Sequence, residues 1–316
     1  MKKKVLITDG VHPLLPRGFE AMGFEVHYQP NTKLEQVHEI VHEYEGMIIN
    51  SKIICDPSLL DKARQLRFIG RLGSGMEIID QVYAAQKGIA VFNSPAGNCN
   101  AVAEHALGML LALANKLTKG DVEVRQKIWN REANRGFEIT GKTVGIIGFG
   151  HTGSAFASKL RGMDVRILTY DKYKTNYAEH LHYVEETTME AIFQEADILS
   201  FHLPLTSEVV HLADDAYLSK FRKPLILINT ARGKIIPTQT LLNGLESGKL
   251  IGVCLDVFEN EKPPTFGAKE QQLYEQLYRF SNSILSPHVA GWTVESKEKL
   301  AAILLQKVNL FYQNEQ

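Results

Sequence analysis

The sequence predicts an α/β fold built from two doubly wound parallel sheets, and three observations support this. Short apolar, β-branched runs alternate with amphipathic stretches of helix length, which is typical of parallel strands covered by helices on both faces. This alternation stops near residue 100 and restarts at Thr143. A chain of 316 residues with 44% hydrophobic content also suits two domains better than one.

Two groups of strands are expected, each strand being followed by polar or mixed sequence of helix length. The strands of the first group lie at residues 5–8, 25–28, 46–49, 68–70 and 89–92. Those of the second group lie at residues 143–147, 165–168, 197–200, 225–228, 251–255 and 283–285.

Two long helices complete the expected fold. Asn100–Lys116 is apolar on nearly all sides, which indicates a buried helix that connects the two domains. Val294–Tyr312 carries apolar residues at helical spacing after the last strand, and we expect it to cross back to the first domain.

The composition excludes several classes of protein. Because 35 Lys and Arg balance 36 Asp and Glu, no basic field exists to attract nucleic acid or an anionic membrane. The apolar run near the N-terminus is too short for a signal peptide, and no window reaches the roughly 18 apolar residues of a membrane span. The three cysteines form no CxxC pair, so we expect reduced thiols, no metal site and a cytoplasmic protein.

The stretch "VGIIGFGHTG" contains the pattern GxGxxG at Gly148, Gly150 and Gly153. Alone, this pattern is as compatible with an ordinary turn as with a dinucleotide-phosphate cradle. Here it follows an apolar strand and opens a helix, and the next strand ends at Asp171, about 20 residues further on, where a dinucleotide fold needs a carboxylate. Asp171 would bind the ribose hydroxyls and repel a 2′-phosphate, which favours NAD, although nearby lysines soften that discrimination.

Three residues that follow later strands fit one reaction. Arg232 suits a substrate carboxylate, His288 a proton donor, and Glu261 a partner that raises the pKa of the imidazole. Taken singly, each also fits a structural role: an arginine that caps a turn, a packed histidine and a solvated loop acid. Together they indicate hydride transfer between a nicotinamide and C2 of a 2-oxo acid.

The segments "NSPAGNCNAVAEHALGMLLAL", "GKTVGIIGFGHTG", "FHLPLT", "INTARG", "LDVFENE" and "SPHVAG" occur in this order. The chain thereby resembles the D-isomer-specific 2-hydroxyacid dehydrogenase family over nearly its whole length. The resemblance implies a discontinuous, flavodoxin-like substrate domain (1–97 and 290–316) and a Rossmann NAD-binding domain (98–289). It also implies that Arg232 binds the substrate carboxylate, that His288 is the general acid/base, and that Glu261, rather than its rival Glu259, is the partner of His288.

The resemblance further implies which residues line the two halves of the site. The cofactor cleft would comprise Gly148, Phe149, Gly150, His151, Thr152, Gly153, Asp171, His202, Pro204, Thr206, Thr230, Ala231, Asp256 and Gly291, with Asp256 near the nicotinamide carboxamide. The backbone of Gly73, Ser74 and Gly75 would close on the substrate carboxylate.

Within the family the chain looks closest to the phosphoglycerate dehydrogenases, but it has Asn50-Ser51-Lys52 where many of these carry an "RS" pair. Lys52 or Arg71 would have to supply the missing phosphate ligand. The chain ends at Gln316, so no C-terminal regulatory domain is expected. The alternatives are a hydroxypyruvate or glyoxylate reductase, and an NAD(H)-sensing binding protein similar to transcriptional corepressors.

By analogy with the family we expect a homodimer whose interface uses the helix from Asn100 and the segment up to Trp129. Trp129 and Trp292 are expected to be packing residues, with Trp292 near enough to His288 to line the site.

Overall fold

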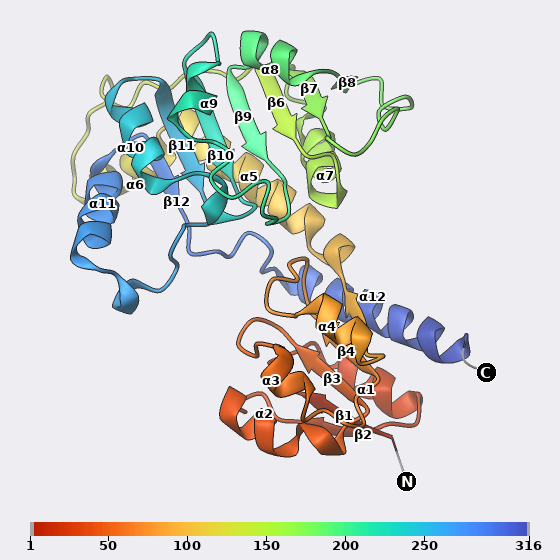
Figure 1. Ribbon diagram of the computed structural model, residues 1–316. Helices are drawn as coiled ribbons and strands as arrows, with labels where there is room; N and C mark the ends of the chain where they lie inside the picture. The colour runs from red at the N-terminus through yellow and green to blue at the C-terminus, as the bar shows by residue number, and fades with distance from the viewer. Residues whose placement is uncertain (1–2, 315–316) are drawn as a thin grey trace. The chain divides into compact units, whose positions relative to one another are not determined.

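The computed structural model describes residues 3–314, which form two compact units (Figure 1). One unit consists of the residues up to Cys99 together with those from Trp292 onward, and the other is Asn100–Gly291. Each unit has its own parallel sheet with helices on both faces, which confirms the predicted fold class.

The sheet of the first unit has the strand order β2-β1-β3-β4-β5, and all its pairings are parallel. This is the flavodoxin-like order. The strands are β1 (Lys4–Ile7), β2 (Glu25–Tyr28), β3 (Gly46–Ile49), β4 (Phe68–Arg71) and β5 (Ala90–Asn93). The helices are α1 (Leu14–Ala21), α2 (Leu34–Ile40), η1 (Val41–Glu43), α3 (Pro57–Leu60), α4 (Gln81–Gln86), η2 (Pro95–Gly97) and α12 (Val294–Gln313).

Helix α12 makes the first unit discontinuous in sequence. Its buried residues Ala301, Leu304 and Val308 share one hydrophobic cluster with strand residues of the first sheet, including Ile48 and Phe68. Burial of this apolar stripe is what holds the C-terminal helix on a sheet formed mainly by the N-terminal third.

The sheet of the second unit has the order β12-β11-β10-β9-β6-β7-β8, again parallel throughout. Its strands are β6 (Thr143–Ile147), β7 (Arg166–Tyr170), β8 (Glu185–Glu186), β9 (Ile198–Phe201), β10 (Leu225–Asn229), β11 (Leu250–Leu255) and β12 (Ser283–Leu285). The strand order reverses between β6 and β9, where ligands of such sheets bind. Strand β8 was not predicted, because two exposed glutamates carry no apolar run.

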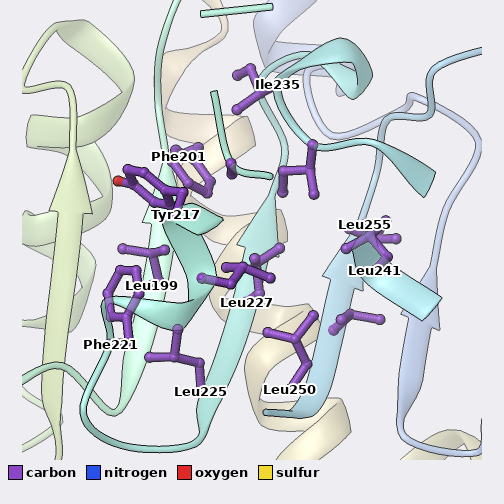
Figure 2. Close-up of a cluster of buried hydrophobic side chains, with 14 of the residues drawn as sticks. Leu199, Phe201, Tyr217, Phe221, Leu225, Leu227, Ile235, Leu241, Leu250 and Leu255 are labelled. Carbon is purple, nitrogen blue, oxygen red and sulfur yellow. The ribbon is translucent and has the colours of Figure 1, made fainter. Parts of the chain in front are cut away.

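Helices cover both faces of the second sheet. The helices from Cys99 to Arg279 are α5 (Cys99–Ala114), α6 (Leu117–Arg125), α7 (His151–Leu160), α8 (Met189–Glu195), α9 (Asp215–Ser219), η3 (Gly233–Ile235), α10 (Thr238–Glu246), η4 (Pro263–Thr265) and α11 (Ala268–Arg279). Figure 2 shows the core on one face, where leucines of β9, β10 and β11 meet Tyr217 of α9, Leu241 of α10 and Phe221, which follows α9. On the other face the apolar side of α5 packs against Val144, Ile226 and Cys254.

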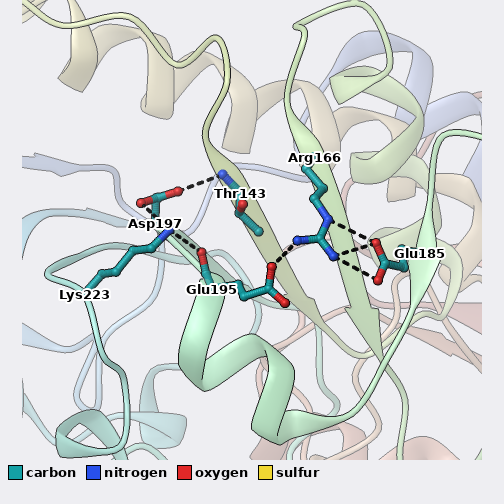
Figure 3. A network of polar contacts seen from close by, with 6 residues as sticks. All are labelled: Thr143, Arg166, Glu185, Glu195, Asp197 and Lys223. Carbon is teal, nitrogen blue, oxygen red and sulfur yellow. Dashed lines mark hydrogen bonds and ion pairs between the residues drawn. The ribbon is translucent and has the colours of Figure 1, made fainter.

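A polar network closes the amino edge of this sheet. Figure 3 shows it joining Thr143, Arg166, Glu185, Glu195, Asp197 and Lys223. Arg166, the first residue of β7, binds both carboxylate oxygens of Glu185 at 2.8–3.0 Å and also pairs with Glu195. The Thr143 N–H donates to Asp197 Oδ2 (2.9 Å). Because these contacts lie where the strands begin, they leave the carboxyl edge of the sheet to other residues.

Within residues 3–314 no helix is both long enough and apolar enough to cross a membrane. The expectation that the two tryptophans are packing residues is wrong: the side chains of Trp129 and Trp292 are 76% and 74% exposed. Trp129 lies beyond α6, a helix with no buried residue, so no core is available to receive it.

Candidate active site

The residues predicted to line the cofactor cleft of the second unit all follow strands of one parallel sheet. The glycine turn follows β6, Asp171 follows β7, His202 follows β9, Thr230 follows β10 and Asp256 follows β11. Because the carboxyl ends of parallel strands meet at one edge, these segments gather at the edge opposite the polar network of Figure 3.

The turn between β6 and α7 needs glycine at two positions and leaves space at a third. Gly148 has φ +90°, and a Cβ there would lie 2.6 Å from the His202 carbonyl oxygen. A Cβ on Gly153 would lie 2.0 Å from the Gly148 carbonyl oxygen. At Gly150, by contrast, no atom lies within 4 Å of the added Cβ position. The turn is therefore tightly packed at Gly148 and Gly153 and open at Gly150. The open side lies beside the first residues of α7, whose free N–H groups favour binding of an anion.

Asp171 lies directly against this turn. Its Oδ2 accepts from the Phe149 N–H (2.9 Å) and its Oδ1 from the Tyr173 N–H (3.0 Å). The two lysines expected to soften discrimination against a 2′-phosphate have other partners: Lys172 pairs with Glu208 (2.5 Å), and Lys174 donates to the Phe149 carbonyl (2.9 Å). Neither lysine is therefore directed toward the position that a 2′-phosphate would take beside Asp171.

Two buried polar atoms at this edge have no hydrogen-bond partner within residues 3–314. They are Nδ1 of His202 and Oγ1 of Thr230, whose residues are 9% and 7% exposed. The other ring nitrogen of His202 contacts the Ser200 hydroxyl (2.9 Å). Burial lowers the pKa of His202 to about 3, so this ring is neutral at physiological pH.

Taken together, these features fit a dinucleotide. The glycine turn is open at the N-terminus of α7, and the Asp171 carboxylate follows β7. The buried polar atoms of His202 and Thr230, after β9 and β10, can each bind a ligand atom.

The structure brings His288 and Glu261 together. His288 Nδ1 lies 2.7 Å from Glu261 Oε2, and the Phe258 N–H donates to Glu261 Oε1 (3.3 Å). Burial tends to raise the pKa of Glu261, but the hydrogen bond from His288 and the neighbouring positive charge of Arg232 outweigh it, so this pKa is lowered. Glu261 is therefore an ionised partner that orients the ring and leaves Nε2 as the nitrogen facing away from it.

Arg232 is held on a turn that lies directly on the Glu261 loop. The Asn229 side chain binds both sides of this turn, donating to the Arg232 carbonyl (2.9 Å) and accepting from the Ala231 N–H (3.1 Å). A Cβ on Gly233 would lie 1.9 Å from the Phe258 carbonyl, so the two backbones touch here. This close approach is what brings the Arg232 charge to Glu261.

Glu259, the rival carboxylate in the same loop, is engaged elsewhere. Its Oε2 accepts from the Thr238 N–H (2.5 Å) at the start of α10, and its Oε1 contacts His211 Nε2 (3.0 Å). Glu259 and His211 line an open pocket of about 580 Å³ whose walls include neither Glu261 nor His288.

The loop that carries His288 has an unusual backbone. His288 has φ +55°, in the left-handed region, which costs a non-glycine residue on the order of 1–3 kcal/mol and persists only when its surroundings impose it. The buried Asp256 carboxylate accepts from the N–H groups of Val289 (2.9 Å) and Ala290 (2.8 Å) and from the Ser286 hydroxyl (2.6 Å). Asp256, expected near the carboxamide, thus also grips the loop on both sides of His288.

Sequence reasoning gave no role to two residues of this arrangement, Ser286 and His105. The His105 ring contacts the Ser286 hydroxyl at 2.8 Å from a position 181 residues earlier in the chain. No spacing in the sequence connects them, so only the fold reveals the contact.

The other predicted substrate residues lie in the first unit, at the end of β4 or in the loops that follow β3 and β4. Lys52 donates to the Pro30 carbonyl (2.5 Å) and lies 3.9 Å from Asp9. Gly73 has φ +150°, and a Cβ there would lie 1.6 Å from Nη1 of the Arg71 guanidinium. Ser74 donates to Asn98 Oδ1 (3.2 Å), while its carbonyl accepts from Asn93 (2.9 Å). The loop that contains Gly75 is thereby tied to the segment after β5.

Among residues 3–314 no group of three or more His, Cys, Asp or Glu side chains is placed to hold a metal ion.

Comparison with known proteins gives a consistent result. Residues 107–290 match the family model described as D-isomer specific 2-hydroxyacid dehydrogenase, NAD binding domain. A glyoxylate reductase of Pyrococcus furiosus is 32% identical, with 100% of this chain and 94% of that protein covered. A D-3-phosphoglycerate dehydrogenase of Archaeoglobus fulgidus is 28% identical over 96% of this chain, which spans only 56% of that protein. The apo-structure of D-lactate dehydrogenase from Escherichia coli superposes with a TM-score of 0.81 at 26% identity, covering 99% of this chain and 98% of that one.

Proposed function

The chain belongs to the D-isomer specific 2-hydroxyacid dehydrogenase family, a family of NAD-dependent oxidoreductases, and we propose that it interconverts a 2-hydroxy acid and its 2-oxo acid. The observation that carries this proposal is the His288–Glu261 pair at 2.7 Å beside the charge of Arg232, on the same sheet edge as the glycine turn.

Each of these residues has a distinct task. Bound NAD supplies the hydride acceptor in oxidation and, as NADH, the hydride donor in reduction. Arg232 binds the substrate carboxylate through its planar guanidinium and polarises the C2 oxygen. His288 Nε2 gives that oxygen its proton in reduction and takes it back in oxidation. Glu261 stays ionised and stabilises the protonated ring by its hydrogen bond to Nδ1.

The two units divide the work. The unit Asn100–Gly291 would hold NAD: the turn from Gly148 to Gly153 would bind the pyrophosphate, and Asp171 the adenosine ribose. In the other unit, the backbone N–H groups of Gly73, Ser74 and Gly75 would also donate to the substrate carboxylate.

The substrate expected from the sequence is 3-phosphoglycerate, with phosphohydroxypyruvate as its product. One observation favours a second candidate, a small unphosphorylated acid such as glyoxylate or hydroxypyruvate. Lys52, a predicted phosphate ligand, donates to the Pro30 carbonyl and has Asp9 beside it, so a phosphate there would meet a like charge. The glyoxylate reductase of Pyrococcus furiosus, matched over nearly its full length, agrees with this candidate.

The test is NADH oxidation by the purified protein with phosphohydroxypyruvate, hydroxypyruvate, glyoxylate and pyruvate. We expect turnover of at least one acid, and a loss in kcat of about 10²-fold or more in His288→Ala. The matched control is His211→Ala, which removes a histidine that also bonds a glutamate but lies outside the proposed site. Equal losses in both variants, or tight NADH binding without turnover of any acid, would overturn the dehydrogenase proposal, and the second result would favour a sensor.

We further propose that the enzyme acts as a cytoplasmic homodimer. The segment from α6 to residue 137 exposes apolar side chains that no core covers: Leu117, Val122, Val124, Ile128, Trp129 and Phe137. Exposed large apolar side chains gathered in one segment favour a subunit interface. Light scattering should give twice the mass of the 35.4 kDa chain, and Trp129→Glu with Val122→Glu should give the monomer mass. A monomer mass for the unmodified protein would refute this proposal.

A further inference from the structure

A partly buried polar cluster joins helix α5 to the loop that carries His288. The Ser286 Oγ lies 2.6 Å from Asp256 Oδ1, and His105 Nε2 lies 2.8 Å from the same Oγ and 3.6 Å from that Asp256 oxygen. Met109, one turn after His105 on α5, places its sulfur 3.9 Å from this hydroxyl. One face of α5 therefore contacts the start of the loop that carries His288.

The chemistry of the three groups fixes the direction of these hydrogen bonds. The Asp256 carboxylate, which already takes two backbone N–H groups, accepts hydrogen bonds only. The single Ser286 proton is therefore donated to Asp256. The Ser286 oxygen must then accept from His105, so the His105 ring carries its proton on Nε2.

This relay acts on the His288 backbone. Asp256 accepts from Val289 and Ala290 while it also holds Ser286, so one carboxylate fixes the loop before and after His288. His288 has a left-handed backbone that its surroundings must impose. Without the His105 proton, the Ser286 hydroxyl loses the partner that keeps it turned toward Asp256.

We propose that His105 is a positioning residue for catalysis: through Ser286 and Asp256 it fixes the loop that holds the His288 ring against Glu261. This inference rests on the proposed role of His288 as the general acid/base. His105 has no contact with the His288–Glu261 pair in this scheme and acts only through the loop.

The connectivity of the chain adds a reason for such a device. The chain passes from one unit to the other between Cys99 and Asn100 and again between Gly291 and Trp292. Helix α5 begins at the first passage, and the His288 loop ends at the second. The cluster thus joins α5, which follows the first passage, to the His288 loop, which precedes the second. It lies beside His288, whose orientation catalysis requires.

The experiment is a double-mutant cycle in the full chain with His105→Leu, Ser286→Ala and the double variant. We expect each single change to lower kcat about tenfold, with the Kd of NADH and the KM of the 2-oxo acid within about twofold of the unmodified protein. The losses in the double variant should be clearly less than additive, because both side chains act on the same Asp256 carboxylate. His105→Gln, whose amide still donates, should recover kcat to within about threefold.

A second readout does not depend on turnover. In 15N-histidine-labelled protein without cofactor, the His288 ring signals, assigned from their loss in His288→Ala, should shift in His105→Leu and return in His105→Gln. The control is His182→Gln, an exposed histidine of the same unit, which should change neither readout.

Additive losses in the cycle, or His288 signals that are unchanged in His105→Leu, would overturn the proposal. If His105→Leu does not fold, Ser286→Ala and His105→Gln still decide between these outcomes. If the unmodified protein reduces no 2-oxo acid, the proposed function fails, while the His288 signals still test the positioning role.

Discussion

Gly150→Ala separates the proposed role of the glycine turn in binding from its role in folding. The Gly150 backbone, at φ −85° and ψ −158°, is accessible to alanine, and no atom lies within 4 Å of the added Cβ. The change removes a favourable N-cap glycine but also restricts the unfolded chain, and these effects oppose each other. We therefore expect the free energy of unfolding to change by less than about 1 kcal/mol.

Binding should respond very differently, because the methyl group would fill the space proposed for the pyrophosphate. We expect the Kd of NADH to rise at least about tenfold, which corresponds to about 1.4 kcal/mol. Urea unfolding followed by circular dichroism and titration with NADH followed by fluorescence measure the two quantities.

Two further alanine variants serve as controls. Gly162→Ala, at another open glycine of the same unit, should leave stability and Kd unchanged. Gly153→Ala places a Cβ 2.0 Å from a carbonyl oxygen and should cost about 1–3 kcal/mol of stability or more. Unchanged NADH affinity in a stably folded Gly150→Ala protein would refute the assignment of the cradle.

Three other predictions concern Glu261, His202 and Arg166. Glu261→Gln should lower kcat about tenfold, because the His288 ring loses the ionised partner that orients it; an unchanged kcat would remove Glu261 from this role. Since the pKa of Glu261 is lowered, its pairing should persist above the ordinary glutamate value of 4.5 and be lost only as the pH falls through the lowered value. When unfolded, His202 binds a proton below about pH 6.5; when folded, it stays neutral down to about pH 3. The free energy of unfolding should therefore fall by about 1.4 kcal/mol for each unit by which the pH is lowered between these values. Urea unfolding at pH 7, 6 and 5 should show this slope reduced in His202→Gln, and equal slopes would contradict the burial argument. Arg166→Met should lower the free energy of unfolding by less than about 1.5 kcal/mol, because its ion pairs with Glu185 and Glu195 are exposed. It should leave the Kd of NADH unchanged. Weakened NADH binding would show that the amino edge of the sheet is not independent of the site.

The sequence alone determined the fold class and most of the strand positions. Apolar runs separated by helix-length segments predicted each strand except β8, which consists of two exposed glutamates. The carboxyl-edge position of Arg232, His288 and Asp171 followed from the same pattern, because parallel strands all end at one edge. These inferences need only local periodicity and the direction of the strands, and both can be read along the chain.

The tertiary structure decided which side chains meet. Two glutamates stand two residues apart in the loop after β11, and only the folded backbone shows that Glu261 contacts His288 while Glu259 turns to His211. The contact of His105 with Ser286 likewise had no signal in the sequence. Exposure was misjudged for the same reason, since Trp129 has an apolar ring but lies where the chain offers no core. Local pattern fixes where an element begins and which face is apolar, whereas contacts between distant residues depend on how loops turn after the strands end, and that turn is set by packing.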